Sequence, residues 1–558
     1  MIPSIALSIF DGYSRDAAFH AIKSPSFIFS MPTFGFLIDN RKCIGCHACT
    51  VACKSEHQVP IGVDRTWVKY VEKGEFPNNR RLFSVMRCNH CDYAPCVTIC
   101  PVTALYRRDD GVVDFNSDRC IGCKACMQAC PYDALYIDPA TDTAAKCNFC
   151  THRLEVGLEP SCVVVCPEQA IVCGDLDDPS SKLSQLIKRH PVQVRKPEKG
   201  TKPKLFYIDG DEASLVPSRT KADGDGMWSR SPAEYSSGEN GEGQQRIATP
   251  GAEISISATT SSSHSIAHDF SHTPEPRRVY DVRARPPAWG WPVVAYTWTK
   301  SIAAGAVLAV AAARLLVGQV EVSAMSTVMG FVALLFLLVT TALLVVDLKQ
   351  PKRFLYVLLR PQWNSWLVRG AYFLVAYSIV VTAWLGLRLV GAKTLADPLL
   401  WLAAVLAIPT AVYTAFLFAQ AKGRDLWQNP LLSIHLLVHA LLAGGATWLM
   451  VAGASGGLNQ AAPRVFTTVM IWVSLATILG EVLTTHPTVD ARRAMAMIVG
   501  RPLGGWFWGG GVLLGHLVPV LLLMSGVEQA ILAPLAILAG IFAIERCWVL
   551  APQRIALS

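Results

Sequence analysis

The sequence predicts a chain of two unlike halves: a cysteine-rich α+β domain, then a disordered linker, then an all-α bundle of eight transmembrane helices. Two observations predict this fold class. Sixteen of the eighteen cysteines fall within residues 43–166, in four short runs of regular spacing. From residue 289 onward the chain is strongly apolar and contains eight stretches long enough to cross a lipid bilayer. The first half therefore has the composition of a metal-binding domain, and the second half that of an integral membrane domain.

The cysteine spacing is typical of iron–sulfur ligation. The runs are Cys43-x2-Cys46-x2-Cys49-x3-Cys53, Cys88-x2-Cys91-x4-Cys96-x3-Cys100-Pro101, Cys120-x2-Cys123-x2-Cys126-x3-Cys130-Pro131 and Cys147-x2-Cys150-x11-Cys162-x3-Cys166-Pro167. Three closely spaced thiolates can wrap one [4Fe–4S] cubane, while the fourth cysteine ligates a different cluster, as in two-cluster ferredoxins. Four complete runs predict four [4Fe–4S] clusters. Structural zinc also uses C-x2-C pairs, but zinc gives no reason for the additional C-x3-C-P spacing.

The cysteine-rich domain is expected to span residues 34–211 and to consist of short elements. The expected elements are a strand over Phe34–Asp39, a hairpin over 106–115 that turns at Asp110-Gly111, short strands over 135–138 and 170–172, and a brief helix after each Cys-Pro pair. The four runs form an internal repeat, so we expect a double ferredoxin-like iron–sulfur domain whose halves face each other. Cys173 and Cys547 lie outside the runs and are expected to be small buried hydrophobic residues.

Two segments are expected to be disordered. Residues 1–33 are interpreted as a disordered leader and not as a signal peptide. Their apolar run lacks the basic n-region and the small-residue cleavage site that a signal peptide has. Residues 212–288 are interpreted as a linker, because most of this segment is rich in Ser, Gly, Thr, Glu and Pro. It has too few large apolar residues to offset the entropy of ordering. The transmembrane domain then covers residues 289–558.

The eight transmembrane helices are expected where the apolar stretches lie. They are residues 293–317, 325–346, 366–390, 399–421, 431–453, 465–485, 506–525 and 529–550. An even number of spans puts both ends of the bundle on the same side of the membrane as the cysteine-rich domain.

Basic residues are concentrated on that side. They are Arg277, Arg278, Arg283, Arg285, Lys349, Lys352, Arg353, Arg360, Lys422, Arg424, Arg492, Arg493, Arg501, Arg546 and Arg554. The opposite side has Arg314, Arg388, Lys393 and Arg464. The positive-inside rule therefore predicts a multi-pass protein of the cell (inner) membrane with a cytoplasmic cysteine-rich domain. Alternatively, the basic loops dock that domain electrostatically. The net charge of +8 lies mostly in the linker and loops, so we expect no nucleic-acid partner.

Several stretches of the first half carry a family resemblance. They are Cys43-Ile44-Gly45-Cys46-His47-Ala48-Cys49, Arg87-Cys88-Asn89-His90-Cys91, Cys96-Val97-Thr98-Ile99-Cys100-Pro101-Val102-Thr103-Ala104-Leu105 and Cys130-Pro131-Tyr132-Asp133-Ala134. Residues 34–210 resemble the four-cluster ferredoxin subunits of molybdopterin oxidoreductases, the family of dimethyl sulfoxide, polysulfide and tetrathionate reductase electron-transfer subunits. The resemblance implies four ligand sets, which are Cys43, Cys46 and Cys49 with Cys166; Cys147, Cys150 and Cys162 with Cys53; Cys88, Cys91 and Cys96 with Cys130; and Cys120, Cys123 and Cys126 with Cys100. Since no part of the sequence resembles a molybdopterin-binding domain, it also implies a separate molybdopterin-containing catalytic subunit.

A second resemblance lies in the membrane half. It is carried by Asp347-Leu348-Lys349-Gln350-Pro351-Lys352-Arg353-Phe354 and by Asn364-Ser365-Trp366-Leu367-Val368-Arg369-Gly370-Ala371-Tyr372. These stretches are similar to a loop and a helix start of the polysulfide-reductase (NrfD-like) membrane-subunit family, and the similarity covers residues 290–550. The resemblance implies that menaquinone or ubiquinone binds at the helix ends that face the cysteine-rich domain, in contact with membrane lipid.

Quinol oxidation releases two protons and two electrons, so the site needs a proton acceptor and hydrogen-bond donors. The candidates on the correct side are Lys300, Asp347, Asn364, Arg369, Glu481 and His486. Each has a structural alternative. For example, Lys300 can extend to the interface, Asp347 can pair with Arg353 or Arg369, and His486 can cap a helix. His435, His439 and His516 are expected to be hydrogen-bonded interior residues or part of a proton path.

These patterns predict an electron-transfer and membrane-anchor subunit of a respiratory molybdopterin oxidoreductase complex, with two small subunits fused into one chain. It would relay electrons between the quinone pool and a separate catalytic subunit through four [4Fe–4S] clusters, as an oxidoreductase subunit rather than a complete enzyme. The alternative function is an energy-converting module that moves protons or ions through the bundle. Lys300, His435, His439, Glu481 and His516 would supply part of such a path.

Overall fold

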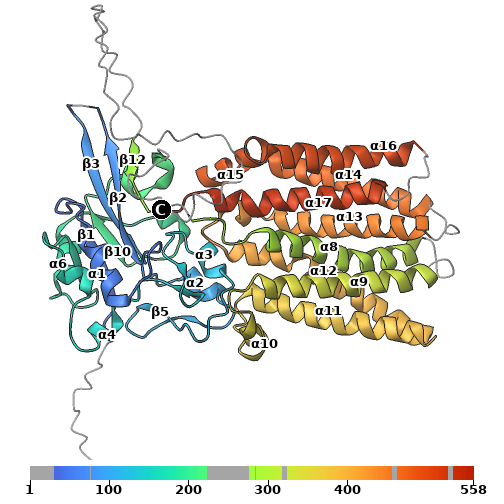
Figure 1. Cartoon of the computed structure of the whole chain (residues 1–558), viewed down its shortest axis with the longest axis horizontal. Coiled ribbons are helices and arrows are strands. Elements are labelled where there is room, and N and C mark those ends of the chain that lie inside the picture. The colour runs from blue at the N-terminus through green and yellow to red at the C-terminus, as the bar shows by residue number, and fades with distance from the viewer. Residues whose placement is uncertain are drawn as a thin grey trace, which may run out of the picture.

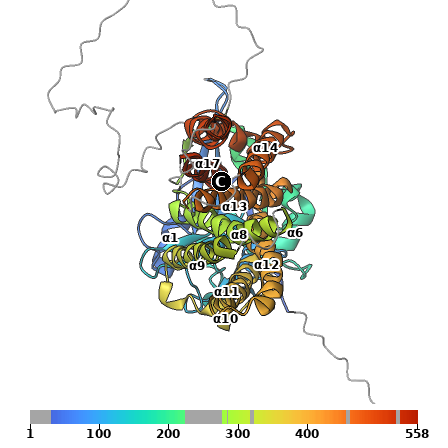
Figure 2. The same ribbon diagram turned by 90° about the vertical axis from the view of Figure 1, so that its right-hand side faces the viewer.

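The computed structural model describes residues 31–222, 276–316, 323–454, 461–525 and 532–558, apart from positions 76, 283 and 284. The cysteine-rich domain lies at one end of an elongated bundle of helices that run side by side (Figures 1 and 2). Nearly all of the predicted leader, up to residue 30, lies outside the described residues.

Within the described residues, the cysteine-rich domain contains two four-stranded sheets and two small hairpins. The first sheet has the order β8 (Ile171–Asp175), β1 (Phe34–Asp39), β10 (Leu205–Ile208) and β9 (Val192–Gln193). The second has the order β11 (Lys221–Ala222), β12 (Arg277–Tyr280), β2 (Thr66–Lys73) and β3 (Arg80–Arg87). The hairpins are β4 (Leu105–Arg107) with β5 (Val113–Phe115), and β6 (Tyr136–Asp138) with β7 (Thr143–Ala145). The predicted hairpin over 106–115 and the predicted short strands are confirmed.

The short helices of this domain are α1 (Ala48–His57), α2 (Pro95–Ile99), α3 (Ala125–Ala129), α4 (Thr151–Leu154), α5 (Ser161–Val164), α6 (Lys182–Arg189) and α7 (Glu212–Leu215). Helices α2, α3 and α5 precede the three Cys-Pro pairs and turns follow those pairs, so the expectation of a helix after each pair was wrong. Cys100 and Cys130 end α2 and α3 in extended conformation, with ψ of 118° and 117°. A proline ring clashes with a helical conformation in the residue before it, so the helix must stop at the cysteine and a turn follows.

The membrane half contains, among the described residues, eight helices long and apolar enough to span a bilayer, and the eight predicted spans are confirmed. They are α8 (Trp291–Leu316), α9 (Ser323–Val346), α11 (Trp366–Leu389), α12 (Lys393–Gln420), α13 (Leu431–Ala454), α14 (Ala461–Leu483), the π-helical segment Gly505–Leu517 continued by α16 (Val518–Met524), and α17 (Leu532–Leu550). Two shorter helices, α10 (Tyr356–Leu359) and α15 (Val489–Val499), lie at the end facing the cysteine-rich domain.

Helices α8, α13 and α17 form the interior of the bundle. The apolar windows of α8 and α13 are 72% buried, whereas those of α9 and α14 are 28% buried and present their remaining surface outward. Gly305 on α8 and Gly444 on α13 face each other so closely that a Cβ on either would collide with the backbone of the other helix. Small residues allow such close approach of transmembrane helices.

The described ends of the predicted linker, residues 212–222 and 276–282, carry secondary structure on the cysteine-rich domain. Helix α7 packs against β2 and β3, and β12 pairs with β2 on one side and β11 on the other. Residues 223–275 lie outside the described part of the chain. The domain boundaries at 211 and 289 stay a prediction.

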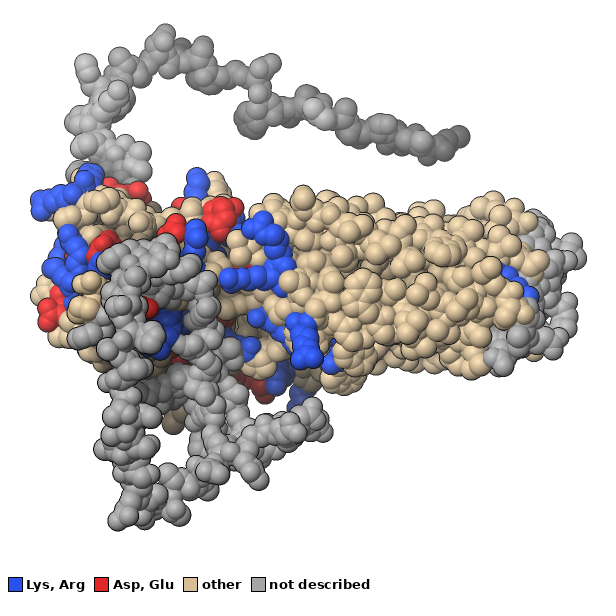
Figure 3. All heavy atoms as spheres, turned by 90° about the horizontal axis from the view of Figure 1, so that it is seen from above, with Lys and Arg blue, Asp and Glu red and all other residues tan. Residues whose placement is uncertain are grey.

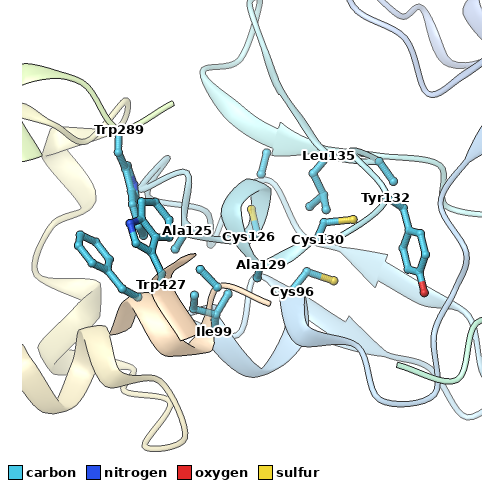
Figure 4. Close-up of a cluster of buried hydrophobic side chains, with 14 of the residues drawn as sticks. Cys96, Ile99, Ala125, Cys126, Ala129, Cys130, Tyr132, Leu135, Trp289 and Trp427 are labelled. Carbon is cyan, nitrogen blue, oxygen red and sulfur yellow. The ribbon is translucent and has the colours of Figure 1, made fainter. Parts of the chain in front are cut away.

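Charged residues concentrate on the cysteine-rich domain and at its border with the bundle, while the visible side of the bundle is almost free of charge (Figure 3). One buried core joins the two halves, since residues such as Ile99, Ala125, Trp289 and Trp427 belong to the same cluster (Figure 4).

Candidate functional site

The first set of cysteines surrounds a cavity in the part of the cysteine-rich domain remote from the bundle. Cys43, Cys46, Cys49 and Cys166 line this cavity, together with apolar side chains such as Val68. Cys49 lies on α1, whereas Cys166 follows α5, so the fold joins two segments more than a hundred residues apart in sequence. These are the four cysteines that the family resemblance assigned to one cluster.

A second cavity of the same kind lies at the border with the bundle. It is lined by Cys100, Cys120, Cys123 and Cys126, together with apolar residues that include Ile121. Here too a cysteine that ends one run joins three cysteines of another run.

The remaining cysteines lie between these cavities in two groups. The thiol of Cys53 is close enough to Cys147 and Cys162 for electrostatic interaction, and Cys150 neighbours the same two residues. In the other group, the thiol of Cys96 interacts with those of Cys130, Cys88 and Cys91. Both groups agree with the ligand sets that the resemblance implies, and the individual ligand assignments stay predictions.

Three of the four cysteines that end a run, Cys100, Cys130 and Cys166, share a turn with the pattern Cys-Pro-x-x-Ala. The Ala104 N–H donates to Cys100 Sγ over 3.2 Å, and the Ala170 N–H donates to Cys166 Sγ over 3.2 Å. The residue before each alanine has a positive φ, 50° at Thr103, which turns the following amide back toward the sulfur. Hydrogen bonds to sulfur favour the thiolate form of the cysteine and influence the reduction potential of a bound cluster.

The donor sets fit iron–sulfur clusters. Burial raises the pKa of the Cys49, Cys130 and Cys150 thiols to about 11, so without a bound cation these side chains are protonated at neutral pH. Metal binding displaces those protons. Iron–sulfur clusters bind to soft thiolate ligands and accept hydrogen bonds from backbone N–H groups. Each of these cavities offers four such thiolates, N–H donors and apolar walls.

The cavity lined by Cys123 contacts the membrane half directly. The Trp289 indole N–H donates to the Cys123 carbonyl over 3.0 Å, and Arg353 donates to the Cys120 carbonyl over 3.0 Å. The backbone amides of Lys349 and Gln350 donate to the carbonyls of Gly122 and Ile121 over 3.3 and 3.2 Å. This cavity is therefore the one held against the transmembrane helices, with α2 and α3 facing the bundle (Figure 1).

Aromatic side chains continue from this contact into the bundle. The ring centroids of Trp289 and Phe418 are 5.6 Å apart, and Phe418 stacks on Trp427 at 4.5 Å. Trp427 donates its indole N–H to the Trp548 carbonyl over 2.9 Å, and the Trp548 ring lies 5.0 Å from that of His435. Figure 4 shows Trp289 and Trp427 beside the short helix that carries Ala125, Cys126 and Ala129.

His435 begins a fully buried polar network inside the bundle. His435 Nδ1 is hydrogen-bonded to Glu481 Oε2 at 2.7 Å, and His439 Nδ1 to Glu545 Oε1 at 2.9 Å. The two imidazole rings are 4.1 Å apart. Lys300, also fully buried, donates from Nζ to the Thr414 hydroxyl over 2.6 Å and to the Ala411 carbonyl over 2.8 Å.

His516 lies apart from these pairs, with Nε2 2.9 Å from the Ser474 hydroxyl and Nδ1 2.9 Å from the Gly511 carbonyl. The expectation that the three histidines are hydrogen-bonded interior residues is confirmed. Glu545 was missed, although a carboxylate inside a predicted span is a signal of function.

The structure separates the predicted quinone-site residues into two groups. Lys300 and Glu481 lie inside the bundle with the histidines. Asp347 instead forms an ion pair at 2.8 Å with Lys124, the residue before α3. The predicted arginine partners donate to backbone carbonyls, Arg353 to that of Cys120 and Arg369 to that of Trp363. Burial raises the pKa of the Asp347 carboxyl, and the ammonium of Lys124 opposes this shift.

Asn364, Arg369 and His486 lie near the helix ends. Asn364 is exposed, and its carbonyl accepts a hydrogen bond from Gln420. Arg369 donates to the Trp363 carbonyl over 2.7 Å. The His486 carbonyl accepts from Arg492 over 3.2 Å. Outside the runs, Cys547 is fully buried in α17 as expected, whereas Cys173 is half-buried in β8.

Comparison with known proteins agrees with this geometry. Residues 80–176 match the family model of the 4Fe-4S dicluster domain, and residues 283–555 match the model described as "Polysulphide reductase, NrfD".

The cysteine-rich half is similar to several reductase subunits. A tetrathionate reductase subunit of Salmonella typhimurium is 45% identical over 193 residues, which are 34% of this chain and 77% of the relative. A polysulfide reductase polypeptide of Wolinella succinogenes is 44% identical over 187 residues, 33% of this chain and 97% of the relative. The iron–sulfur subunit ArrB of the arsenate respiratory reductase of Shewanella sp. is 38% identical over 222 residues, 31% of this chain and 95% of the relative.

The fold and the site thus define a multi-pass membrane protein that carries iron–sulfur clusters for electron transfer. The protein belongs to the family that includes these tetrathionate and polysulfide reductase subunits, and here the iron–sulfur subunit is fused to an NrfD membrane domain.

Proposed function

We propose that this chain relays electrons between a membrane quinone pool and a separate molybdopterin-containing catalytic subunit. The single observation that supports this proposal is the contact between the four-cysteine cavity at Cys123 and the bundle, from which tryptophan side chains lead to a buried acid–histidine network. [4Fe–4S] clusters, when bound, accept and release single electrons. The chain would hold four of them in the ligand sets given above. Its relatives are named as parts of reductases, which supports a catalytic partner for this chain as well.

The quinone head group would bind at the cluster-facing end of the bundle, and the network would take up its protons. His435 is the fifth residue of α13, and Glu481 and Glu545 lie two and five residues before the ends of their helices. At 1.5 Å per residue, these groups lie within about 8 Å of the cluster-facing helix ends. His435, polarised by Glu481, is a suitable general base for a quinol hydroxyl. Menaquinol and ubiquinol present the same two hydroxyl groups to such a base.

The depth of this network favours an electron relay over ion translocation. Lys300, nine residues from the start of α8, lies about 14 Å deep. Among the described residues, the next ion pair inside the bundle, Arg314 with Asp397 at 2.6 Å, lies at the opposite end. Proton uptake from the cluster-facing side requires no polar path across the whole membrane.

The cysteine-rich domain would face the cytoplasm. Some of the basic residues counted for topology contact that domain, such as Arg353 at the Ser117 carbonyl and Arg493 at the Ser218 carbonyl. This agrees with the docking alternative for those residues. Others on the same side are exposed: Lys352, Arg360, Lys422, Arg492, Arg501 and Arg554. They still outnumber the basic residues of the opposite side, which supports the positive-inside assignment.

Anaerobic purification followed by quinol reduction tests the proposal. The full chain should contain about sixteen irons and as many acid-labile sulfides. A water-soluble menaquinol or ubiquinol analogue should then bleach the visible cluster absorbance and produce the paramagnetic signal of reduced clusters. Zinc in place of iron would refute the relay. Iron-loaded protein would also refute it if neither quinol reduces the clusters and neither quinone reoxidises them after reduction by dithionite. Trypsin digestion of right-side-out and inverted vesicles tests sidedness, because cleavage of the cysteine-rich domain in right-side-out vesicles contradicts a cytoplasmic location.

A further inference from the structure

One buried cation of the cysteine-rich domain has no part in the contacts described so far. Arg87, the last residue of β3, is completely buried. Its Nη1 donates to Cys162 Sγ over 3.1 Å, and its guanidinium carbon lies 4.5 Å from the centre of the Phe36 ring. Its Nε and Nη2 atoms are buried and have no hydrogen-bond partner among the described residues. An arginine with two unpaired N–H groups in a core is costly unless a negatively charged group faces it.

The thiols that face Arg87 belong to two different ligand sets. The guanidinium interacts electrostatically with Cys162 and Cys147 of one set and with Cys49 of the other. Helix α1 joins these sets, since Cys49 and Cys53 are one helical turn apart and fall into different sets. Arg87 therefore lies at the junction of two adjacent sites, with donors left over for the inorganic sulfides that those sites would hold.

We propose that Arg87 is a fixed positive charge that raises the reduction potentials of the two clusters held by these sets. The inference rests on the ligand sets of the proposed function. Reduction of a thiolate-ligated [4Fe–4S] cluster adds one negative charge, and a cation in a buried environment of low dielectric favours the more negative state. Hydrogen bonds to cluster sulfur act in the same direction.

A purely structural role for Arg87 predicts something different. In that case the guanidinium would only fill space and balance the charge of the thiolates, so its replacement would alter folding or iron content. The potentials of clusters that do assemble would then be unchanged. Redox potentiometry therefore separates the two roles, whereas measurement of activity would not.

The decisive experiment is a redox titration of the anaerobically purified full chain, followed by electron paramagnetic resonance. Arg87→Gln removes the charge and keeps an N–H donor, on a side chain two bonds shorter. We expect two of the cluster midpoint potentials to shift downward, with iron and sulfide content equal to that of the wild type. Lys42→Gln is the matched control, because Lys42 is exposed and adjacent to Cys43, so water screens its charge and the potentials should not move.

Arg87→Lys keeps the test conclusive if the glutamine variant fails to assemble. Lysine retains one positive charge but cannot present the planar fork of donors, so a smaller downward shift of the same two signals is expected. Unchanged potentials in every variant that retains its iron overturn the inference, and so does an equal shift of all signals in Lys42→Gln. Reduction by quinol is measured separately, so a failure of the relay would not be confused with a failure of this inference.

Discussion

The ion pair between Lys124 and Asp347 allows a quantitative test of how the two halves are held together. Its atoms are 2.8 Å apart, and the two side chains are only 12% and 11% exposed. Asp347→Asn leaves the ammonium buried without a counter-charge. Removing one partner of a buried pair costs about 3 kcal/mol or more. That corresponds to a shift of roughly a hundredfold in the equilibrium between the closed and the opened interface.

Hydrogen exchange reports that shift locally. The amides of Lys349 and Gln350 donate across the same interface, so they exchange only when it opens. In Asp347→Asn, exchange of the peptide that contains these amides should be roughly a hundredfold faster than in the wild type, at equal iron content. The double variant Lys124→Met/Asp347→Leu should restore much of the protection, because an apolar pair leaves no charge buried. Exchange within threefold of the wild type in Asp347→Asn would refute the reasoning.

Three further predictions concern the clusters, the network and a buried amine. Cys126→Ser should lower the iron content by about four atoms per chain, whereas Cys173→Ser should leave it unchanged in elemental analysis. His435→Gln should slow cluster reduction by quinol, followed by stopped-flow absorbance, by about 10²-fold or more, while reduction by dithionite and the rate in His516→Gln stay the same. Burial lowers the pKa of Lys69 to about 7, and its Nζ has no hydrogen-bond partner in the described part of the chain.

Because the unfolded protein binds that proton up to its ordinary pKa of 10.5, the stability of the folded protein should rise with pH between about 7 and 10.5. Below pH 7 the amine is charged in both states and its full penalty remains. Lys69→Met should therefore raise stability at pH 7 by on the order of 4 kcal/mol and flatten that pH dependence. Thermal loss of the visible cluster absorbance, recorded at several pH values, measures both effects. An unchanged profile would contradict the lowering of the Lys69 pKa by burial.

The elements that follow from local spacing were predictable from the sequence. The cysteine runs, the turn at Asp110-Gly111 and the apolar stretches of spanning length each depend on residues that are close together in the sequence. The position of the short helices was wrong because the third cysteine of a run needs a helical turn before the Cys-Pro pair, a tertiary demand of the site. Sequence spacing alone did not reveal which side of the proline that turn occupies.

Contacts between segments that are distant in the sequence were much harder to predict. The Lys124–Asp347 pair joins residues 223 positions apart, and the nearer arginines in the sequence were the obvious but wrong partners. Glu545 stands beside Arg546 near the end of the last span, so it could be interpreted as part of a polar helix end. Only the packing of α17 against α13 brings its carboxylate to His439.

The return of the polypeptide to the cysteine-rich domain in β12 has a consequence for the assembly. Because β12 pairs with β2, the covalent tie between the domain and the bundle is residues 281–290, which span at most about 35 Å when extended. Because this linker is short, the cysteine-rich domain rebinds the bundle at an effective concentration in the millimolar range even after the interface between them is weakened. Dilution therefore cannot separate the cysteine-rich domain from the bundle. Insertions or deletions within residues 223–275 leave the length of the linker at 281–290 unaltered.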